Sequence, residues 1–172
     1  GVSLDIRHKT RSLPAVMTAI GRSILRLAKQ VPNGMVVFTG SYRYEQSLVD
    51  FWKTKAPHIW KELNSTKRLF REPKDSKQTD ELLTSFSESA SSDRRGALLF
   101  SVMGGKLSEG INFANDLCRC VVVIGLPYPD AKDPLLQEKL KLLPGSGGGT
   151  GGFSYLRSLC LRSVNQSVGR AI

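Results

Sequence analysis

The fold is set by the apolar, β-branched run Met35-Val36-Val37-Phe38-Thr39, which is followed by Gly40-Ser41-Tyr42. An uninterrupted apolar run of this length is typical of a parallel strand that is covered on both faces. Before it, apolar residues between Leu13 and Ala28 recur at three- and four-residue spacing, which predicts an amphipathic helix that ends near Pro32. The region therefore predicts a helix, a buried strand, a glycine turn and a second helix.

The rest of the chain repeats this alternation of strands and helices. Strands are expected at 67–71, 97–102 and 120–124, and helices at 42–55, after Pro57, at 75–89, after Asp133 and from Phe153, with 87–95 as a polar loop. The last helix is expected to bury Phe153, Leu156, Cys160 and Val164. We predict an α/β fold whose parallel sheet has helices on both faces. Ligands of such sheets lie at the carboxyl ends of strands, which indicates the loops from Gly40, Met103 and Gly125, with the turn around Gln166 reached through packing.

Length and composition favour one soluble, intracellular, metal-free domain. The chain has 172 residues, of which 40% are hydrophobic and 23% charged, and no apolar run approaches a membrane span. Three cysteines are too few for a disulfide framework, and Cys118 and Cys120 fit a buried strand better than a metal site. Residues 145–152 hold six glycines and predict a flexible linker, either natural or introduced.

The charge balance favours an anionic partner. Lysines and arginines number 25 against 15 acidic residues, which gives a formal net charge of +10. The excess is concentrated in residues 5–30 and 53–77. Nucleic acid is one such partner and is favoured over a neutral metabolite, although a solvated basic face is equally consistent with the pattern.

The phosphate-binding signature G-x-x-x-x-G-K-[ST] is absent, because Leu107 follows Gly105-Lys106 where a hydroxyl residue is needed. Asp80-Glu81 lies on a helical face and predicts solvated surface rather than a metal site. Two features remain. The loop 104–113 follows a strand, and its glycines permit close approach to a phosphate or simply make a tight turn. Arg170 follows Gly169 and is either an arginine finger for a neighbouring domain or an ordinary surface arginine.

Three of these segments together resemble ordered helicase motifs. Val36 to Tyr42 resembles motif IV, Gly104 to Phe113 resembles motif V, and Gln166 to Ile172 is similar to the start of motif VI. The chain thus resembles the XPD-like iron–sulfur DNA helicases of superfamily 2. Segments 67–74, 116–120, 126–129 and 164–166 look most like the chromosome-loss (ChlR, Warsaw breakage) branch.

The resemblance implies that residues 1–172 are the second RecA-like motor domain, a three-layer fold of the P-loop NTPase type, ending within motif VI. It implies that Gln166 and Arg170 face the γ-phosphate of ATP, with Arg170 stabilising transition-state charge. It implies further nucleotide-site positions at Gly105, Glu109, Gly110, Asn112 and Gly169, although Asn112 departs from the commoner aspartate. Ser41, Tyr42, Lys106 and Ser108 would contact single-stranded DNA, and the alternative for Tyr42 is a core aromatic at a helix start.

The resemblance also implies cofactors, partners and a location. ATP and Mg²⁺ would be shared with a first motor domain, and a 4Fe–4S cluster would belong to the full-length protein rather than to this part. Single-stranded and forked DNA are the expected substrates, and the expected polarity is 5′ to 3′. No membrane partner is expected. The implied roles are DNA repair and chromatid cohesion, and the implied location is the nucleus. The alternative is a stand-alone nucleic-acid-binding module without ATPase activity. A transferase or dehydrogenase is disfavoured because no G-x-G-x-x-G follows a strand.

Overall fold

The computed structural model describes residues 5–75, 78–105, 107, 117–129, 132–143 and 150–169. Its centre is a four-stranded parallel sheet of order β2-β3-β1-β4. The strands are β1 (Gly34–Thr39), β2 (Arg68–Arg71), β3 (Ala97–Val102) and β4 (Cys120–Ile124). β1 pairs with β3 on one side and β4 on the other, with Val37 opposite both Phe100 and Val122. The predicted parallel α/β fold is confirmed.

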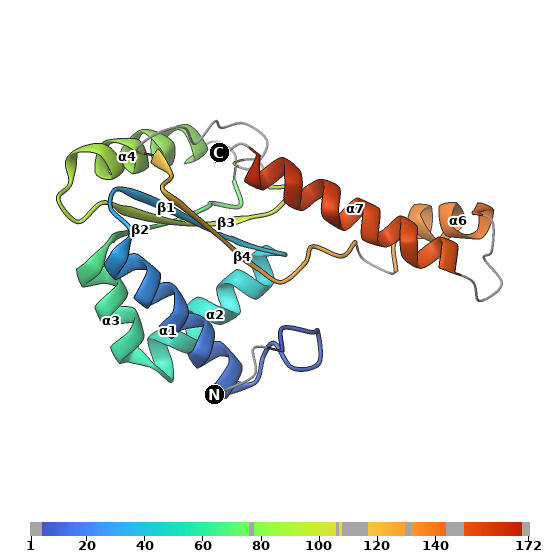
Figure 1. Cartoon of the computed structure of the whole chain (residues 1–172), viewed down its shortest axis with the longest axis horizontal. Helices are drawn as coiled ribbons and strands as arrows, with labels where there is room; N and C mark the ends of the chain where they lie inside the picture. The colour runs from blue at the N-terminus through green and yellow to red at the C-terminus, as the bar shows by residue number, and fades with distance from the viewer. Residues whose placement is uncertain are drawn as a thin grey trace.

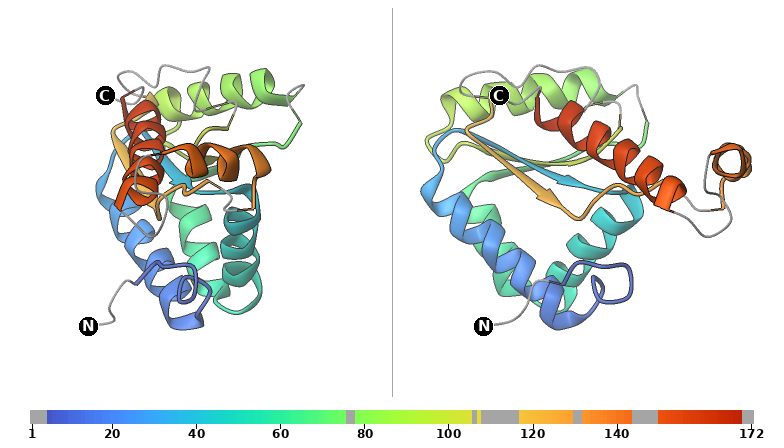
Figure 2. Two further views of the ribbon diagram at one scale, coloured as in Figure 1. Left: turned by 90° about the vertical axis from the view of Figure 1, so that its right-hand side faces the viewer. Right: turned by 45° about the vertical axis from the view of Figure 1, so that its right-hand side comes forward.

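Three helices cover one face of the sheet (Figures 1 and 2): α1 (Pro14–Gln30), α2 (Tyr42–Thr54) and α3 (Pro57–Thr66). They pack on Met35 and Val37 of β1 and on Leu98 and Phe100 of β3. Successive strand residues point to opposite faces, so Val36 and Phe38 belong to the other core.

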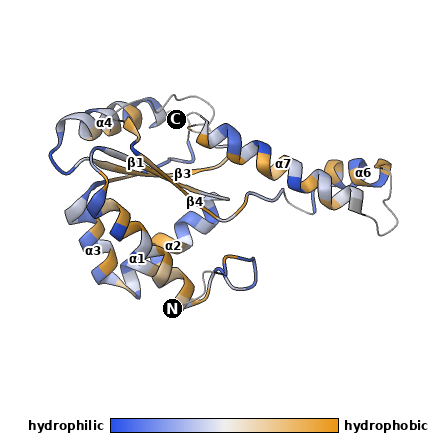
Figure 3. Cartoon of the chain, in the orientation of Figure 1, coloured by the Kyte–Doolittle hydropathy of each residue, from blue (hydrophilic) through white to orange (hydrophobic). Residues whose placement is uncertain are grey.

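That second core lies under α4 (Thr79–Ser92), which crosses the opposite face of the sheet (Figure 2). Phe86 and Ala90 of α4 pack on it, and Val164 of α7 (Thr150–Val168) reaches its border. The colouring of Figure 3 shows the apolar strands between these helical layers. The three-layer arrangement follows from strands that are apolar on both faces.

The C-terminal helices form an arm that extends from the sheet (Figure 1). α6 (Pro134–Leu142) begins after Asp133, as predicted, and the Asp133 side chain caps it by accepting a hydrogen bond from the Leu135 N–H at 2.9 Å. α7 runs back from the arm toward the sheet, and its Cys160 is fully buried. None of the described helices combines the length and apolar character needed to cross a bilayer.

Two predicted helix boundaries are wrong. α4 runs from Thr79 to Ser92 instead of 75–89, so the expected polar loop at 87–95 is helical from 87 to 92. α7 begins at Thr150, three residues before Phe153, and Phe153 is 63% exposed rather than buried. Serine-rich and glycine-rich sequences have weak helix propensity, and tertiary context overrides it. Residues 145–149 of the predicted linker lie outside the described residues.

Close packing of α1 on α2 and α3 depends on Gly21. Trp52 of α2 is fully buried and its indole Nε1–H donates to the carbonyl of Met17 at 2.8 Å. A Cβ at position 21 would lie 2.6 Å from that same Nε1 and 2.9 Å from Ile59 Cγ2. The absence of a side chain lets the indole reach the helix backbone.

We therefore expect Gly21→Ala to lower the free energy of unfolding by about 1–3 kcal/mol, because the added methyl group overlaps the Trp52 ring. Gly152→Ala is the matched control: it also lies in a helix, and its added Cβ would meet nothing nearer than Leu140 Cδ2 at 3.6 Å. Urea unfolding of both variants tests this. A Gly21→Ala protein as stable as Gly152→Ala would contradict the packing argument.

Candidate functional site

The candidate site is the edge of the sheet where all four strands end. Because the strands are parallel, their carboxyl ends meet at this edge. Ser41 follows β1, Glu72 follows β2, Gly104 and Gly105 follow β3, and Gly125 follows β4. The edge carries two clusters of side chains, one on each side of the start of α2.

The first cluster is a groove of about 950 Å³ over the ends of β1 and β4, here called the basic groove. Its lining combines cations, hydroxyls and aromatic rings from three parts of the chain: Ile6, Arg7, His8, Arg11, Gly40, Ser41, Tyr44 and residues 124–129. Leu126 and Tyr128 are about half exposed. A cationic groove with an accessible aromatic ring has the chemistry that single-stranded nucleic acids bind.

The cations of the basic groove are held by local contacts. The Arg11 guanidinium lies over the Tyr44 ring, 4.7 Å from its centroid, and the Tyr44 hydroxyl donates to the Arg11 carbonyl at 3.2 Å. Arg7 donates to both carboxylate oxygens of Asp5, and this hydrogen bonding lowers the pKa of Asp5 to about 2. Arg11 thus offers a positioned charge, whereas an acid already neutralises Arg7.

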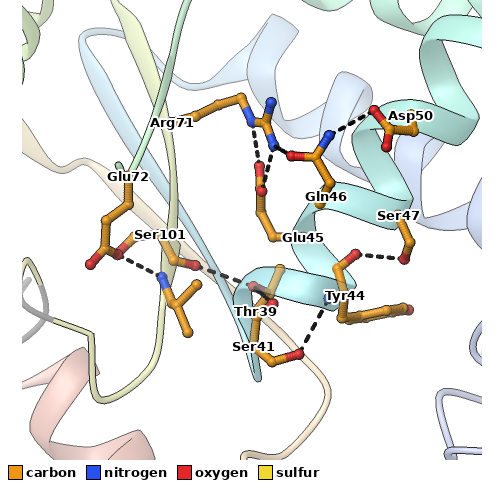
Figure 4. Close-up of polar contacts among 11 residues, drawn as sticks. Thr39, Ser41, Tyr44, Glu45, Gln46, Ser47, Asp50, Arg71, Glu72 and Ser101 are labelled. Carbon is orange, nitrogen blue, oxygen red and sulfur yellow. Dashed lines mark hydrogen bonds and ion pairs between the residues drawn. The ribbon is translucent and has the colours of Figure 1, made fainter. Parts of the chain in front are cut away.

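The second cluster surrounds the carboxylate of Glu72, which is 8% exposed. Figure 4 shows Glu72 beside Ser101. Its Oε2 accepts from Ser101 Oγ at 2.6 Å and from the Val102 N–H at 2.9 Å. Its Oε1 accepts from the Tyr42 hydroxyl at 2.7 Å and from the Leu107 N–H at 3.3 Å. We call these five residues the Glu72 cluster.

Ser41 and Tyr42 were both predicted to touch DNA, but they face different clusters. Ser41 lines the basic groove and caps α2, where its Oγ accepts from the Tyr44 N–H at 3.3 Å. Tyr42 turns toward Glu72 and lies half buried at the first position of α2. Burial and the Glu72 carboxylate raise the pKa of the Tyr42 hydroxyl, which stays protonated as a donor.

The loop after β3 fits closely around the same carboxylate. Gly104 has a positive φ of 71°, and Gly105 donates its N–H to the Val102 carbonyl at 2.9 Å. A Cβ at position 105 would lie 2.5 Å from Glu72 Oε1. Glycine is required there because the carboxylate occupies the space of a side chain.

Helix α7 brings the predicted motif VI toward this loop. A Cβ on Gly104 would lie 3.8 Å from Ser163 Oγ, so α7 passes beside the glycines. Gln166 is exposed and lies one helical turn beyond Ser163, on the same face of the helix. Gly169 follows α7 and donates its N–H to the Asn165 carbonyl at 2.8 Å.

Six predicted site residues lie outside the described residues: Lys106, Ser108, Glu109, Gly110, Asn112 and Arg170. Their roles stay predictions.

Sequence reasoning missed Glu72, Arg11 and Tyr128 as site residues. Glu72 carried a usable signal, because it directly follows a predicted strand and the carboxyl-end rule applies there as it does at Gly40. Arg11 lies in a basic segment before α1, and only the folded chain brings it to Tyr44.

Cys118 and Cys160 are buried thiols, and Cys120 is half-buried. Cys118 is 7% exposed, and burial raises its pKa to about 11. Its Sγ donates to the Cys120 carbonyl at 3.3 Å. Within the described part of the chain, no three His, Cys, Asp or Glu side chains are grouped to hold a metal ion.

The parallel sheet with helices on both faces defines an α/β domain, and comparison with known families specifies it further. The family model for the helicase C-terminal domain matches residues 24–172. The chain belongs to this family.

Relatives of known name support the chromosome-loss branch. The chain is 42% identical over 182 residues to the ATP-dependent DNA helicase DDX11 of Danio rerio, covering 100% of this chain and 20% of the relative. It is 38% identical over 180 residues to the ATP-dependent DNA helicase CHL1 of Scheffersomyces stipitis, covering 99% and 21%. The chain thus spans about a fifth of the length of these relatives.

Solved structures support the fold. A structure titled XPD helicase aligns with a TM-score of 0.65 at 24% identity, covering 92% of this chain and 26% of that one. An apo XPD structure gives 0.68 at 23% identity, covering 96% and 30%. The expected likeness to the XPD helicases is therefore confirmed for the fold.

We expect Gly105→Ala to destabilise the chain by about 1–3 kcal/mol, because the new methyl group collides with both Glu72 Oε1 and the Val102 carbonyl. Gly40→Ala is the control at the same edge, since its Cβ would meet Leu126 O and Pro127 Cα only at 3.6 Å. Thermal unfolding of both variants provides the measurement. Equal melting temperatures would show that the loop does not pack on Glu72 as described.

Proposed function

We propose that this chain is the C-terminal motor domain of an ATP-dependent 5′ to 3′ DNA helicase. The observation that carries the proposal is the basic groove at the carboxyl ends of β1 and β4, in a chain of the helicase C-terminal family. Its relatives are named ATP-dependent DNA helicases. A single strand would bind with its phosphates near Arg11 and its bases against Tyr128.

The nucleotide would bind between this domain and a first motor domain that supplies the phosphate-binding loop and the Mg²⁺ ligands. Gln166 and Arg170 would face the γ-phosphate, and Gly105, Glu109, Gly110, Asn112 and Gly169 would line this side of the cleft. The position of Ser163 beside Gly104 supports the assignment, because it brings α7 close to the loop that starts the predicted motif V.

Closure on ATP and reopening after hydrolysis would move the two domains along DNA. Lys106 and Ser108 would contribute further strand contacts beside Ser41. Forked DNA as substrate, an iron–sulfur cluster elsewhere in the full-length protein, roles in repair and cohesion, and a nuclear location remain parts of this proposal that rest on the resemblance.

We expect the chain by itself to bind single-stranded DNA weakly, with an affinity that falls steeply as salt rises. Arg11→Gln should weaken binding similarly for all sequences and reduce the salt slope by about 1, as for loss of one phosphate contact. Fluorescence anisotropy with oligo-dT at several salt concentrations measures both quantities. Arg26→Gln, at an exposed position of α1 away from the basic groove, is the matched control. Equal effects of the two variants would place the DNA elsewhere.

In a protein that contains both motor domains, Arg170→Ala should lower the kcat for ATP hydrolysis by about 10³- to 10⁵-fold, as for loss of an arginine finger. Affinity for single-stranded DNA should stay within a factor of about three. Steady-state ATPase assays test the expected loss of kcat, and DNA titration of the same preparation tests the retained affinity. Loss of DNA binding with ATPase activity kept would make Arg170 a DNA contact. Measurable ATP turnover by the 172-residue chain alone would contradict a shared site and favour a different kind of enzyme.

A further inference from the structure

Glu72 is a buried carboxylate, and the four hydrogen-bond donors that reach it from the described residues are all neutral. They are the hydroxyls of Tyr42 and Ser101 and the backbone N–H groups of Val102 and Leu107. Glu45, the other buried carboxylate near the start of α2, is instead paired with the Arg71 guanidinium through two hydrogen bonds of 2.7 Å (Figure 4). Among the described residues, these four donors offset the desolvation of Glu72.

The donors come from parts of the chain that are far apart in sequence. Tyr42 begins α2, one residue after Ser41 of the basic groove. Ser101 and Val102 end β3, and Leu107 lies beyond the glycines that α7 passes. Leu107 is itself fully buried, so its contact with Glu72 is fixed by packing as well as by hydrogen bonding.

We propose that Glu72 is a positioning residue that couples the DNA-facing start of α2 to the nucleotide-facing loop after β3. One oxygen, Oε1, accepts from Tyr42 and from Leu107 and so joins the two segments directly. Because both hydrogen bonds use the same acceptor oxygen, a movement of either segment that shifts this oxygen also disturbs the hydrogen bond of the other segment. The inference rests on the proposed function, because it assigns DNA to one segment and nucleotide to the other.

The geometry does not allow glutamine to replace the carboxylate of Glu72. Each oxygen of Glu72 receives one backbone N–H, Val102 at Oε2 and Leu107 at Oε1. Hydroxyl groups can reverse and accept, but a backbone N–H can only donate. A glutamine would therefore set its NH₂ group against an N–H in either orientation, although its shape is nearly unchanged.

The test compares Glu72→Gln with Glu45→Gln in a protein that contains both motor domains. Both substitutions neutralise a buried carboxylate at this edge, and both should lower the melting temperature. Only Glu72→Gln should lower the DNA-stimulated kcat, by about tenfold or more as for a displaced site, with the KM for ATP changed less than about threefold. An equal loss in both variants, or full DNA stimulation in Glu72→Gln, would overturn the proposal.

Tyr42→Phe keeps the proposal testable if Glu72→Gln does not fold. It removes only the hydrogen bond from α2, so DNA stimulation should fall while hydrogen exchange of the Leu107 amide should stay at its wild-type rate. Unchanged DNA stimulation in Tyr42→Phe would overturn the coupling.

If the wild-type protein with both motor domains shows no DNA-stimulated ATPase activity, that result refutes the proposed function and not the role of Glu72. Amide exchange of Val102 and Leu107 then decides the role of Glu72. Faster exchange in Glu72→Gln than in Glu45→Gln supports positioning, and equal exchange overturns it.

Discussion

Burial of β1 between two helical layers is the constraint on which the rest of the structure depends. Met35, Val36, Val37, Phe38 and Thr39 have no exposed surface. A strand that is apolar on both faces needs a paired strand on each side and helices above and below. β3 and β4 meet the first need, and both run parallel to β1, so three strands end at the same edge. The position of the candidate site follows from this pairing.

Buried polar groups hold that edge in one arrangement. The single hydroxyl hydrogen of Thr39, at the end of β1, is shared between the carbonyls of Ser41 and Ser101, and the Met103 N–H donates to the Thr39 carbonyl. Glu72 gathers the next set of donors. In the described residues every buried side-chain nitrogen and oxygen has a hydrogen-bond partner. Such fully satisfied networks define a unique conformation, and this one fixes the loops that the proposed function uses.

Local sequence predicted the parts of the fold that have strong local signals. The strands 97–102 and 120–124 match β3 and β4 residue for residue, because β-branched and apolar runs are unambiguous. The helix predicted at 42–55 matches α2 to within one residue, and in the structure Ser41 caps it. The start of α7 was not predicted, because Thr150, Gly151 and Gly152 disfavour a helix on their own.

The site was predicted at the level of the edge but not of its contacts. The carboxyl-end rule indicated the loops from Gly40, Met103 and Gly125, and all three follow strands of the observed sheet. The side chains of Ser41 and Tyr42 face different clusters because Tyr42 bonds to Glu72. This contact depends on tertiary structure and cannot be read from the local sequence. The stacking of Arg11 on Tyr44 joins residues 33 apart and leaves no local pattern in the sequence.

The central claim is that the carboxyl edge of the sheet is the surface that meets DNA. Hydrogen–deuterium exchange of the chain with and without oligo-dT at low salt tests it most directly. We predict that DNA slows exchange in residues 7–11, 40–44 and 125–129, and leaves the outer surfaces of α1 and α3 unchanged. Slowed exchange confined to α6 and the first turns of α7, with the edge unaffected, would contradict the account.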